Sequence, residues 1–486
     1  MKKKGAIVSV IALAALAGGC SQSRERKLVR SAAEAIGGAT RIQTIKTLTI
    51  EGEGDAPNLG QNITPDAELP NWKVTGYKRV IDFEHRRMRT QQRRDAQFLF
   101  AGATTQRQDQ SLDGDVAFNT GEDGVARRVS DAAAGDRRID MSRHPVAIVR
   151  AALEPGVKLS NLRSEAGRDF VDIDGLTLGI DQESHLPAFV KRTENNDNLG
   201  DVEVTTSFSD WETVNGVKLP RRLTTKIDTY PQFDLRVSKN TVDGEIGDLA
   251  APQAVRASEA PKGATPPHVE AQEVGKGIWW LAGSGNHRSV LFEFEDHLTL
   301  FEVPLNEARS AAVIAKARSL RPQKPLTEAI VSHHHFDHSG GLRTAVAEGL
   351  TIVTHRGDVE FFKELVARPH TLVPDELRRH PQPLKIRAVD DQLTLKDKSM
   401  EVRLHHVIDN PREGTLLFAY VPRDRMLVQA DLYDSTWLQH PWADNFLWNL
   451  KMRHLAVERH VPVHGTIQTH AEVLATLRSK GALSGE

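Results

Sequence analysis

The segment that most constrains the fold is SHHHFDHSGG, residues 332–341, which holds four histidines and one aspartate within six positions. It follows the apolar run TEAIVS, which is typical of a buried strand, and precedes a predicted helix that begins at Leu342. Alternation in an extended chain turns His333 and His335 to the same side. A turn that begins at Phe336 then presents Asp337 and His338 toward a second nearby position. The segment therefore predicts a strand end that opens onto a polar loop in an α/β domain.

Imidazole and carboxylate are the ligands that borderline divalent metals such as Zn²⁺ prefer. Two later residues also follow apolar strands, Asp431 in MLVQADLY and His464 in HVPVHGT. Each alone is weak, because a single polar residue at a strand end is more often a cap. The loop of residues 333–338 by itself can serve one or two divalent ions, and a resemblance to a known family adds Asp431 and His464 to it.

The pattern resembles the metallo-β-lactamase superfamily, whose signature is His-x-His-x-Asp-His at the end of a strand. The resemblance runs from Val269 to the C-terminus and implies an αββα sandwich over residues 269–486. It implies Zn²⁺ as the cofactor, with Fe or Mn as alternatives, and Asp337 as a catalytic group beside the metal. The implied metal ligands are His333, His335, Asp337, His338, Asp431 and His464.

One ligand of this pattern is absent. The family carries a third histidine for the first metal in a segment like Gly-Asn-Pro-His, where this chain has Arg412 in DNPREG. An arginine does not deprotonate and cannot ligate a metal. Three outcomes stay open: a substitute ligand from Glu413, His405 or His406; a single metal with Arg412 as a catalytic cation; or a domain that has lost activity.

Three more polar residues fall near the same strand ends. His287 lies in a loop that the family places beside the metals, and His355 follows a strand and is a candidate to orient a ligand. Glu302 stands where relatives carry a supporting aspartate, and its additional methylene makes that contact an open question.

Residues 21–246 are predicted to form a β-rich, mostly antiparallel domain that follows a helix around RKLVRSAAEA. Asp174-Gly175 and Asn215-Gly216 separate strand-like runs and are strong hairpin signals. The stretch from Trp211 to Pro220 resembles the half-barrels that carry or sort lipoproteins in the bacterial envelope. The basic run 85–94 is interpreted as a solvated strand face balanced by acidic neighbours.

The N-terminus, MKKKGAIVSVIALAALAGGC, joins three lysines to an apolar run that is too short to span a bilayer. It predicts a signal peptide over residues 1–20. The small residues before Cys20 resemble a bacterial lipobox, which implies a lipid anchor on that cysteine. The expected location is the periplasmic side of the cell envelope, at the outer membrane. Residues 247–268, rich in proline and alanine, are predicted to be a linker between the two domains.

A formal net charge of -2 gives no reason to expect nucleic acid as a partner. The leading hypothesis is an exported metal-dependent hydrolase that acts on a small ester, thioester, amide or phosphoester rather than a true β-lactamase. The alternatives are a non-catalytic lipid- or lipoprotein-binding protein with a vestigial metal domain, and an iron-dependent redox enzyme. The sequence does not give the oligomeric state.

Overall fold

A computed structural model describes residues 23–262 and 267–483. The predicted signal peptide and Cys20 lie outside these residues. Within the described ranges, no helix has both the length and the apolar character needed to cross a membrane.

The described residues before 263 form one antiparallel sheet of 13 strands in the order β6-β5-β4-β3-β2-β1-β13-β12-β11-β10-β9-β8-β7. Its centre is the pairing of the first strand with the last, because Leu48 lies opposite Val242. The predicted turns Asp174-Gly175 and Asn215-Gly216 join neighbouring strands. The strands are β1 (Thr47–Pro57), β2 (Asn71–Asp82), β3 (Arg87–Ala96), β4 (Thr105–Asp113), β5 (Val116–Thr120), β6 (Ala126–Arg128), β7 (Leu159–Glu165), β8 (Arg168–Ile173), β9 (Leu176–Asp181), β10 (Pro187–Asn196), β11 (Gly200–Val214), β12 (Val217–Ile227) and β13 (Tyr230–Val242).

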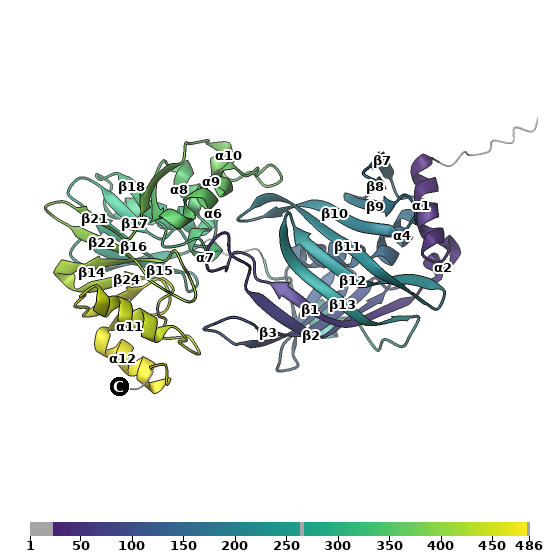
Figure 1. The fold of residues 1–486 in the computed structure, drawn as a ribbon, viewed down its shortest axis with the longest axis horizontal. Helices are drawn as coiled ribbons and strands as arrows, with labels where there is room; N and C mark the ends of the chain where they lie inside the picture. Colours follow the sequence, from purple (N-terminus) through teal and green to yellow (C-terminus); the bar gives the residue numbers. More distant parts are fainter. Residues whose placement is uncertain (1–22, 263–266, 484–486) are drawn as a thin grey trace, which may run out of the picture.

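Helices pack against this curved sheet (Figure 1). They are α1 (Arg24–Ala35), α2 (Ala39–Thr44), α3 (Asp131–Ser142) and α4 (Pro145–Leu153). The basic run lies on β3 and is paired as expected, with Arg87 bonded to Asp113 and Arg89 to Asp109. A short helix, α5 (Gln253–Ala257), falls inside the predicted linker, where Val255 packs against Phe118.

The described residues after 266 form two mixed sheets. The first has seven strands: β14 (Val269–Gly275), β15 (Ile278–Gly283), β16 (Ser289–Glu293), β17 (Leu298–Phe301), β18 (Leu326–Ile330), β19 (Thr351–His355) and β20 (Lys385–Val389). The second has six: β21 (Gln392–Lys396), β22 (Glu401–His406), β23 (Leu417–Val421), β24 (Met426–Gln429), β25 (Arg459–Pro462) and β26 (Gln468–Thr469). The helices are α6 (Glu307–Leu320), α7 (Phe336–Ser339), α8 (Leu342–Ala347), η1 (Arg356–Asp358), α9 (Val359–Ala367), α10 (Glu376–Arg379), η2 (Pro422–Asp424), α11 (Ala443–Met452) and α12 (His470–Ser479).

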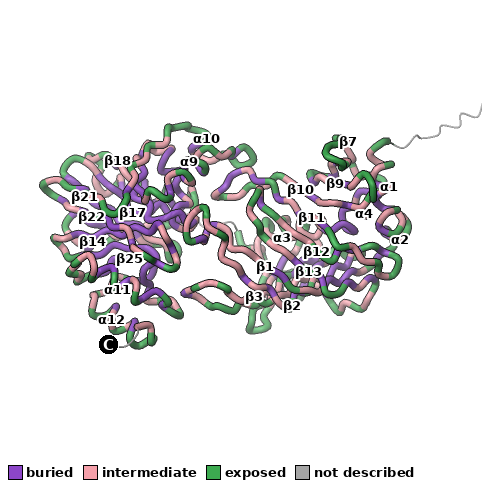
Figure 2. Tube along the Cα trace, viewed as in Figure 1, coloured by how far each residue is buried: buried purple, intermediate pink, exposed green. Residues whose placement is uncertain are grey.

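The two sheets share one apolar core, in which Phe292 and Ile330 of the first meet Phe418 and Val428 of the second. Residues of α11 and α12 belong to the same core, whereas α6, α8 and α9 cover the other face of the seven-stranded sheet. Figure 2 shows this buried interior in purple. The arrangement agrees with the predicted α/β class and with two sheets between helices.

The two halves of the molecule are in direct contact. Leu199 and Val202, at the tip of β10 and β11, are buried with residues of α8 and α9. In the loop between β3 and β4, the Ala101 carbonyl accepts a hydrogen bond from Leu438 N at 3.0 Å. The loop between β1 and β2, residues 58–70, reaches the start of α7 (Figure 1). The N-terminal sheet therefore approaches the histidine-rich loop.

Candidate metal centre

The predicted ligands meet at one end of the two sheets. Asp431 follows β24, His464 follows β25, and His338 lies in the helix that begins just after β18. His338 Nε2 is 3.0 Å and His464 Nε2 is 3.1 Å from the same oxygen, Asp431 Oδ1. All three are buried. Parallel pairing of β24 with β25 brings residues 33 positions apart to one edge, because equivalent ends of parallel strands lie side by side.

A second group lies on the other side of Asp431. His333 Nε2 and His335 Nδ1 are 3.0 Å apart, and they lie 3.8 and 4.0 Å from Asp431 Oδ2. Both rings are fully buried. Asp431 thus stands between two pairs of histidines, one at each carboxylate oxygen.

Each imidazole is held from behind through its other nitrogen. His335 Nε2 is 2.9 Å from Glu413 Oε2, His338 Nδ1 is 2.9 Å from Glu302 Oε2, and His464 Nδ1 is 2.7 Å from the Asn286 carbonyl. These partners only accept hydrogen bonds, so they place the proton on the outward nitrogen. His333 Nδ1 makes its contact with Ser332 Oγ at 2.9 Å. Metal-binding histidines have this kind of support, which fixes the ring and its tautomer.

The inward nitrogens then fit a cation. With their protons held outward, neutral His338 and His464 direct lone pairs at each other across 3.1 Å between their Nε2 atoms. Two lone pairs at that distance repel unless a positive charge lies between or beside them. A proton or a divalent ion satisfies this requirement, and the nearby carboxylate of Asp431 favours the larger charge. The residues present therefore fit a metal ion.

Charge in the centre is consistent with this fit. Burial by itself lowers the pKa of His338, but Asp337, Asp431 and Glu302 raise it well above its usual value. Burial raises the pKa of Asp431, yet the charge on His338 and its histidine hydrogen bonds hold it well below its ordinary range. Both shifts have the sign expected where carboxylates and imidazoles lie close together and favour positive charge on the imidazole.

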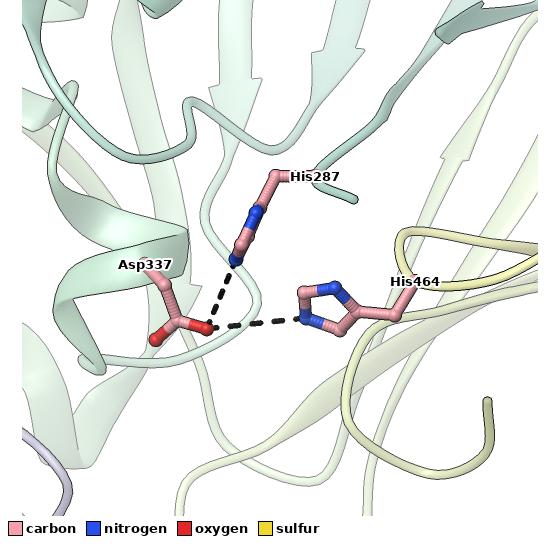
Figure 3. A group of neighbouring side chains, drawn as sticks. All are labelled: His287, Asp337 and His464. Carbon is pink, nitrogen blue, oxygen red and sulfur yellow. Dashed lines mark hydrogen bonds and ion pairs between the residues drawn. The ribbon is translucent and has the colours of Figure 1, made fainter. Parts of the chain in front are cut away.

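Asp337 forms the solvent-facing side of the centre. Its Oδ2 lies 3.3 Å from His338 Nε2, 3.3 Å from His287 Nε2 and 3.9 Å from His464 Nε2. Figure 3 shows His287 and His464 directed at this oxygen from two different loops. The Asp337 side chain is 29% exposed and that of His287 is 22% exposed, whereas His338 is inaccessible. The Asp337 side is therefore the side of the centre that solvent reaches.

Arg412 lies on the same side of Asp431 as His333 and His335. Its Nε is 3.3 Å from Asp431 Oδ2, and its guanidinium lies 5.6 Å from the centre of the Trp442 ring. The turn that carries it is fixed by Asn410, whose side-chain oxygen accepts hydrogen bonds from the main-chain N of Arg412 and Glu413. The predicted departure from the histidine pattern thus places a cation beside the Asp431 carboxylate.

The candidate substitute ligands do not join His333 at Asp431. Glu413 contacts His335 on the outward nitrogen, and with His334 and His335 it forms a separate buried group whose donor atoms lie close enough together to hold an ion. His405 faces Arg453, and the His406 Nε2 contact is with the Gly414 carbonyl at 2.9 Å. Glu413 also approaches His334, whose pKa burial lowers but two carboxylates raise to about 9. These carboxylates therefore favour the protonated form of His334.

Glu302 makes the supporting contact that the sequence left open. Its longer side chain bonds both His338 and the main-chain N of Ser332, the latter at 2.9 Å. His355 instead stacks on His406, with ring centres 4.2 Å apart, and does not touch the inward histidines.

Sequence reasoning missed Gln61, Asn62 and Asn286, because no motif marks them. The only available signal was polar residues in a loop between two strands.

A cleft lies to one side of the candidate centre. This cleft of about 1080 Å³ is lined by residues of both halves, among them Asn62, Tyr230, His355 and Thr415. The inward-facing histidines do not line it, so the geometry of donors, and not the size of a hollow, defines the candidate centre.

Comparisons with known proteins give a likeness of fold for part of the chain. No family model and no curated protein matches the sequence. Among solved structures, a metallo-beta-lactamase from Pontibacter korlensis is 13% identical, with 44% of this chain and 98% of that chain covered and a TM-score of 0.35. The metallo-beta-lactamase FIM-1 from Pseudomonas aeruginosa, in its mono-zinc form, is 13% identical, with 44% of this chain and 97% of that chain covered and a TM-score of 0.35. The rubredoxin oxygen:oxidoreductase of Desulfovibrio gigas is 16% identical, with 44% of this chain and 61% of that chain covered and a TM-score of 0.34. At these values we take neither activity nor ligands from the likeness.

Proposed function

We propose that the chain is an exported metal-dependent hydrolase of the metallo-β-lactamase type, with one divalent ion held by Asp337, His338, Asp431 and His464. The observation that carries the proposal is the set of buried imidazoles, each fixed outward by an acceptor and directed inward at Asp431. Zinc is the first candidate and iron or manganese the alternatives, because all three accept nitrogen and carboxylate ligands. An ion bound there would supply Lewis-acid activation of water and of a carbonyl or phosphoryl oxygen.

Asp337 is the group best placed to move a proton. It is the most exposed carboxylate of the centre, and its Oδ1 accepts a hydrogen bond from Gln61 Nε2 and contacts none of the histidines. In this proposal Asp337 orients the attacking water and accepts its proton, as a general base within hydrogen-bond reach does.

Arg412 supplies the positive charge on the opposite side of Asp431. A guanidinium donates several hydrogen bonds in one plane and stabilises negative charge that develops on a substrate oxygen. Its cation also disfavours a second divalent ion close by, because like charges repel strongly in a buried site. We therefore propose one metal per chain and a substrate with a polarisable ester, thioester, amide or phosphoester group.

Hydrolysis by the full chain tests this function. Metal-depleted protein is reloaded with Zn²⁺, Fe²⁺ or Mn²⁺ and offered nitrophenyl esters, a nitrophenyl phosphodiester, an acyl thioester and a lactone. We expect metal-dependent turnover of at least one substrate, with a loss of at least about 100-fold in His464→Ala. The control His268→Ala changes an exposed histidine away from the centre. Turnover that needs no metal, or no turnover of any class by metal-loaded protein, contradicts the hydrolase.

Export and lipid anchoring complete the proposal and are supported by the sequence of residues 1–20 alone. In a bacterial host, wild-type protein is expected in the membrane fraction and Cys20→Ser in the soluble periplasmic fraction. Equal distribution of the two would contradict the lipid anchor.

A further inference from the structure

We infer that the N-terminal half supplies one wall of the metal centre, the loop of residues 58–70, and that Gln61 in it is a positioning residue for Arg412 and Asp337. The inference rests on the proposed function, since it takes Asp337 as a metal ligand and Arg412 as the substrate-facing cation. It assigns to the β-rich half a part in the chemistry in addition to any anchoring role.

The Gln61 carboxamide joins the two charged groups directly. Its Nε2 donates to Asp337 Oδ1 at 3.0 Å, and its Oε1 accepts from Arg412 Nη2 at 2.6 Å. The polarity of the amide matches each partner, because a carboxylate only accepts and a guanidinium only donates. Both polar atoms of Gln61 are therefore engaged by residues of the other half of the molecule.

A neutral amide in this place keeps two opposite charges apart. A guanidinium and a carboxylate without a spacer tend to form a bidentate pair. Such a pair would draw Arg412 away from Asp431 and withdraw Asp337 from the histidines. By bonding to both, Gln61 holds Asp337 facing His287 and His338 and leaves Arg412 facing Asp431.

The next residue supports the histidines themselves. The Asn62 carbonyl lies 3.0 Å from His335 Nε2, on the same outward nitrogen that Glu413 contacts. The Asn62 side chain is buried and donates to the carbonyls of Thr64 and Pro65, which fixes the shape of the loop. His335 is thus held by acceptors from both halves of the chain.

The loop is docked on both segments that carry its partners. Gly60 has a φ of +74°, and a Cβ at this position would lie 2.3 Å from the ring of Phe336, the residue before Asp337. Ile63 O accepts a hydrogen bond from Gly414 N at 2.6 Å, two residues after Arg412. If the loop served only to dock the N-terminal half on the other half, these packing contacts would be enough. They do not require the half-buried side chain of Gln61 to bond to both Asp337 and Arg412.

The experiment uses the full chain and Gln61→Met, which preserves side-chain length and removes both hydrogen bonds. The matched control is Gln43→Met, an exposed glutamine of α2. Zinc affinity is measured by competition with a chromophoric chelator, and the visible spectrum of bound Co²⁺ reports the ligand field without any substrate. Loss of outer support of a ligand typically weakens metal binding by about 10- to 100-fold. We expect about tenfold weaker zinc binding and a changed Co²⁺ spectrum in Gln61→Met only, with an unfolding midpoint close to wild type.

The outcomes separate this inference from the proposed function. A wild-type chain that takes up no metal overturns both. A wild type that binds metal, with Gln61→Met matching Gln43→Met in affinity and spectrum, overturns the inference alone. Should Gln61→Met fail to fold, Gln61→Glu keeps the length and the acceptor for Arg412 but sets a second carboxylate against Asp337. Its Co²⁺ spectrum is then expected to differ from wild type, and an identical spectrum overturns the inference.

Discussion

Arg412 and His338 share the carboxylate of Asp431: Arg412 Nε lies 3.3 Å from Oδ2, and His338 Nε2 lies 3.0 Å from Oδ1. A carboxylate that bridges two metals offers one oxygen to each. Here a fixed guanidinium takes the oxygen that faces His333 and His335. The arrangement therefore divides the candidate centre into the side of His338 and His464, which fits a metal ion, and a side that carries the guanidinium of Arg412.

Replacing the cation by a ligand should raise the metal content. In Arg412→His the repulsion disappears and a third imidazole joins His333 and His335, so we expect about two metals per chain against about one in wild type. Elemental analysis of dialysed protein measures the difference.

The control for that substitution is Arg403→His, which changes an exposed arginine of β22 paired with Glu401. It should leave the metal content at the wild-type value. Two metals already present in wild type would contradict the single-metal assignment. One metal in both wild type and Arg412→His would contradict the claim that Arg412 excludes a second ion.

Glu302→Gln tests the support behind His338. The glutamate accepts from both His338 Nδ1 and Ser332 N, whereas a glutamine amide would turn its NH₂ group toward one of these donors. Zinc affinity is expected to fall by about 10- to 100-fold. Glu328→Gln on β18, which contacts Thr299 and Arg387, is the control and should bind zinc as wild type does. Equal affinities in the two variants would show that Glu302 does not support the metal site.

A pair of glycine substitutions tests the docking of the 58–70 loop. Gly60 and Gly114 both have positive φ, but only a Cβ on Gly60 meets another residue, the Phe336 ring. Each alanine variant should lose about 1 kcal/mol through backbone strain. Gly60→Ala should in addition weaken zinc binding, because the loop must move away from the centre. If both variants bind zinc equally well, the loop does not contribute to the site.

Buried His144 predicts a loss of stability in acid. Burial, with a smaller contribution from Arg79, lowers its pKa from 6.5 to about 3. Between these values the unfolded chain binds a proton that the folded chain does not, so the free energy of unfolding falls as the pH falls. One such group changes it by about 1.4 kcal/mol per pH unit.

The comparison for this effect is metal-free His144→Asn, because asparagine retains the N-cap of α4 without titrating in this range. Urea unfolding at several pH values between 6.5 and 4 gives the slope for each protein. The free energy of unfolding of wild type should change with pH more steeply than that of His144→Asn, by about 1.4 kcal/mol per pH unit. Parallel slopes would mean that His144 is protonated equally in both states.

The sequence predicted those parts of the centre that local patterns carry. The strand before His333, the turn at Phe336 and the strand ends at Asp431 and His464 follow from apolar runs and their polar ends. The hairpin turns follow from Asp-Gly and Asn-Gly pairs for the same reason. Such features depend on neighbouring residues, which a single sequence displays.

Long-range contacts were out of reach. Gln61 lies 276 residues before Asp337, and nothing in its own segment distinguishes it from other loop glutamines. The side of His335 that Glu413 contacts depends on how two loops pack, so the sequence could not show which nitrogen of His335 faces Glu413. Helices α3 and α4 lie between strands β6 and β7. They were not predicted from the sequence, because the segments on both sides have the alternating pattern of strands.

Anomalous diffraction from a crystal of the full chain, collected at the zinc edge, tests the central claim most directly. The account predicts one strong peak within bonding distance of His338 Nε2, His464 Nε2 and an oxygen of Asp431, and none between Arg412 and His333. A protein crystallised with excess zinc that shows no peak at these three residues, or a peak only on other groups, would contradict it.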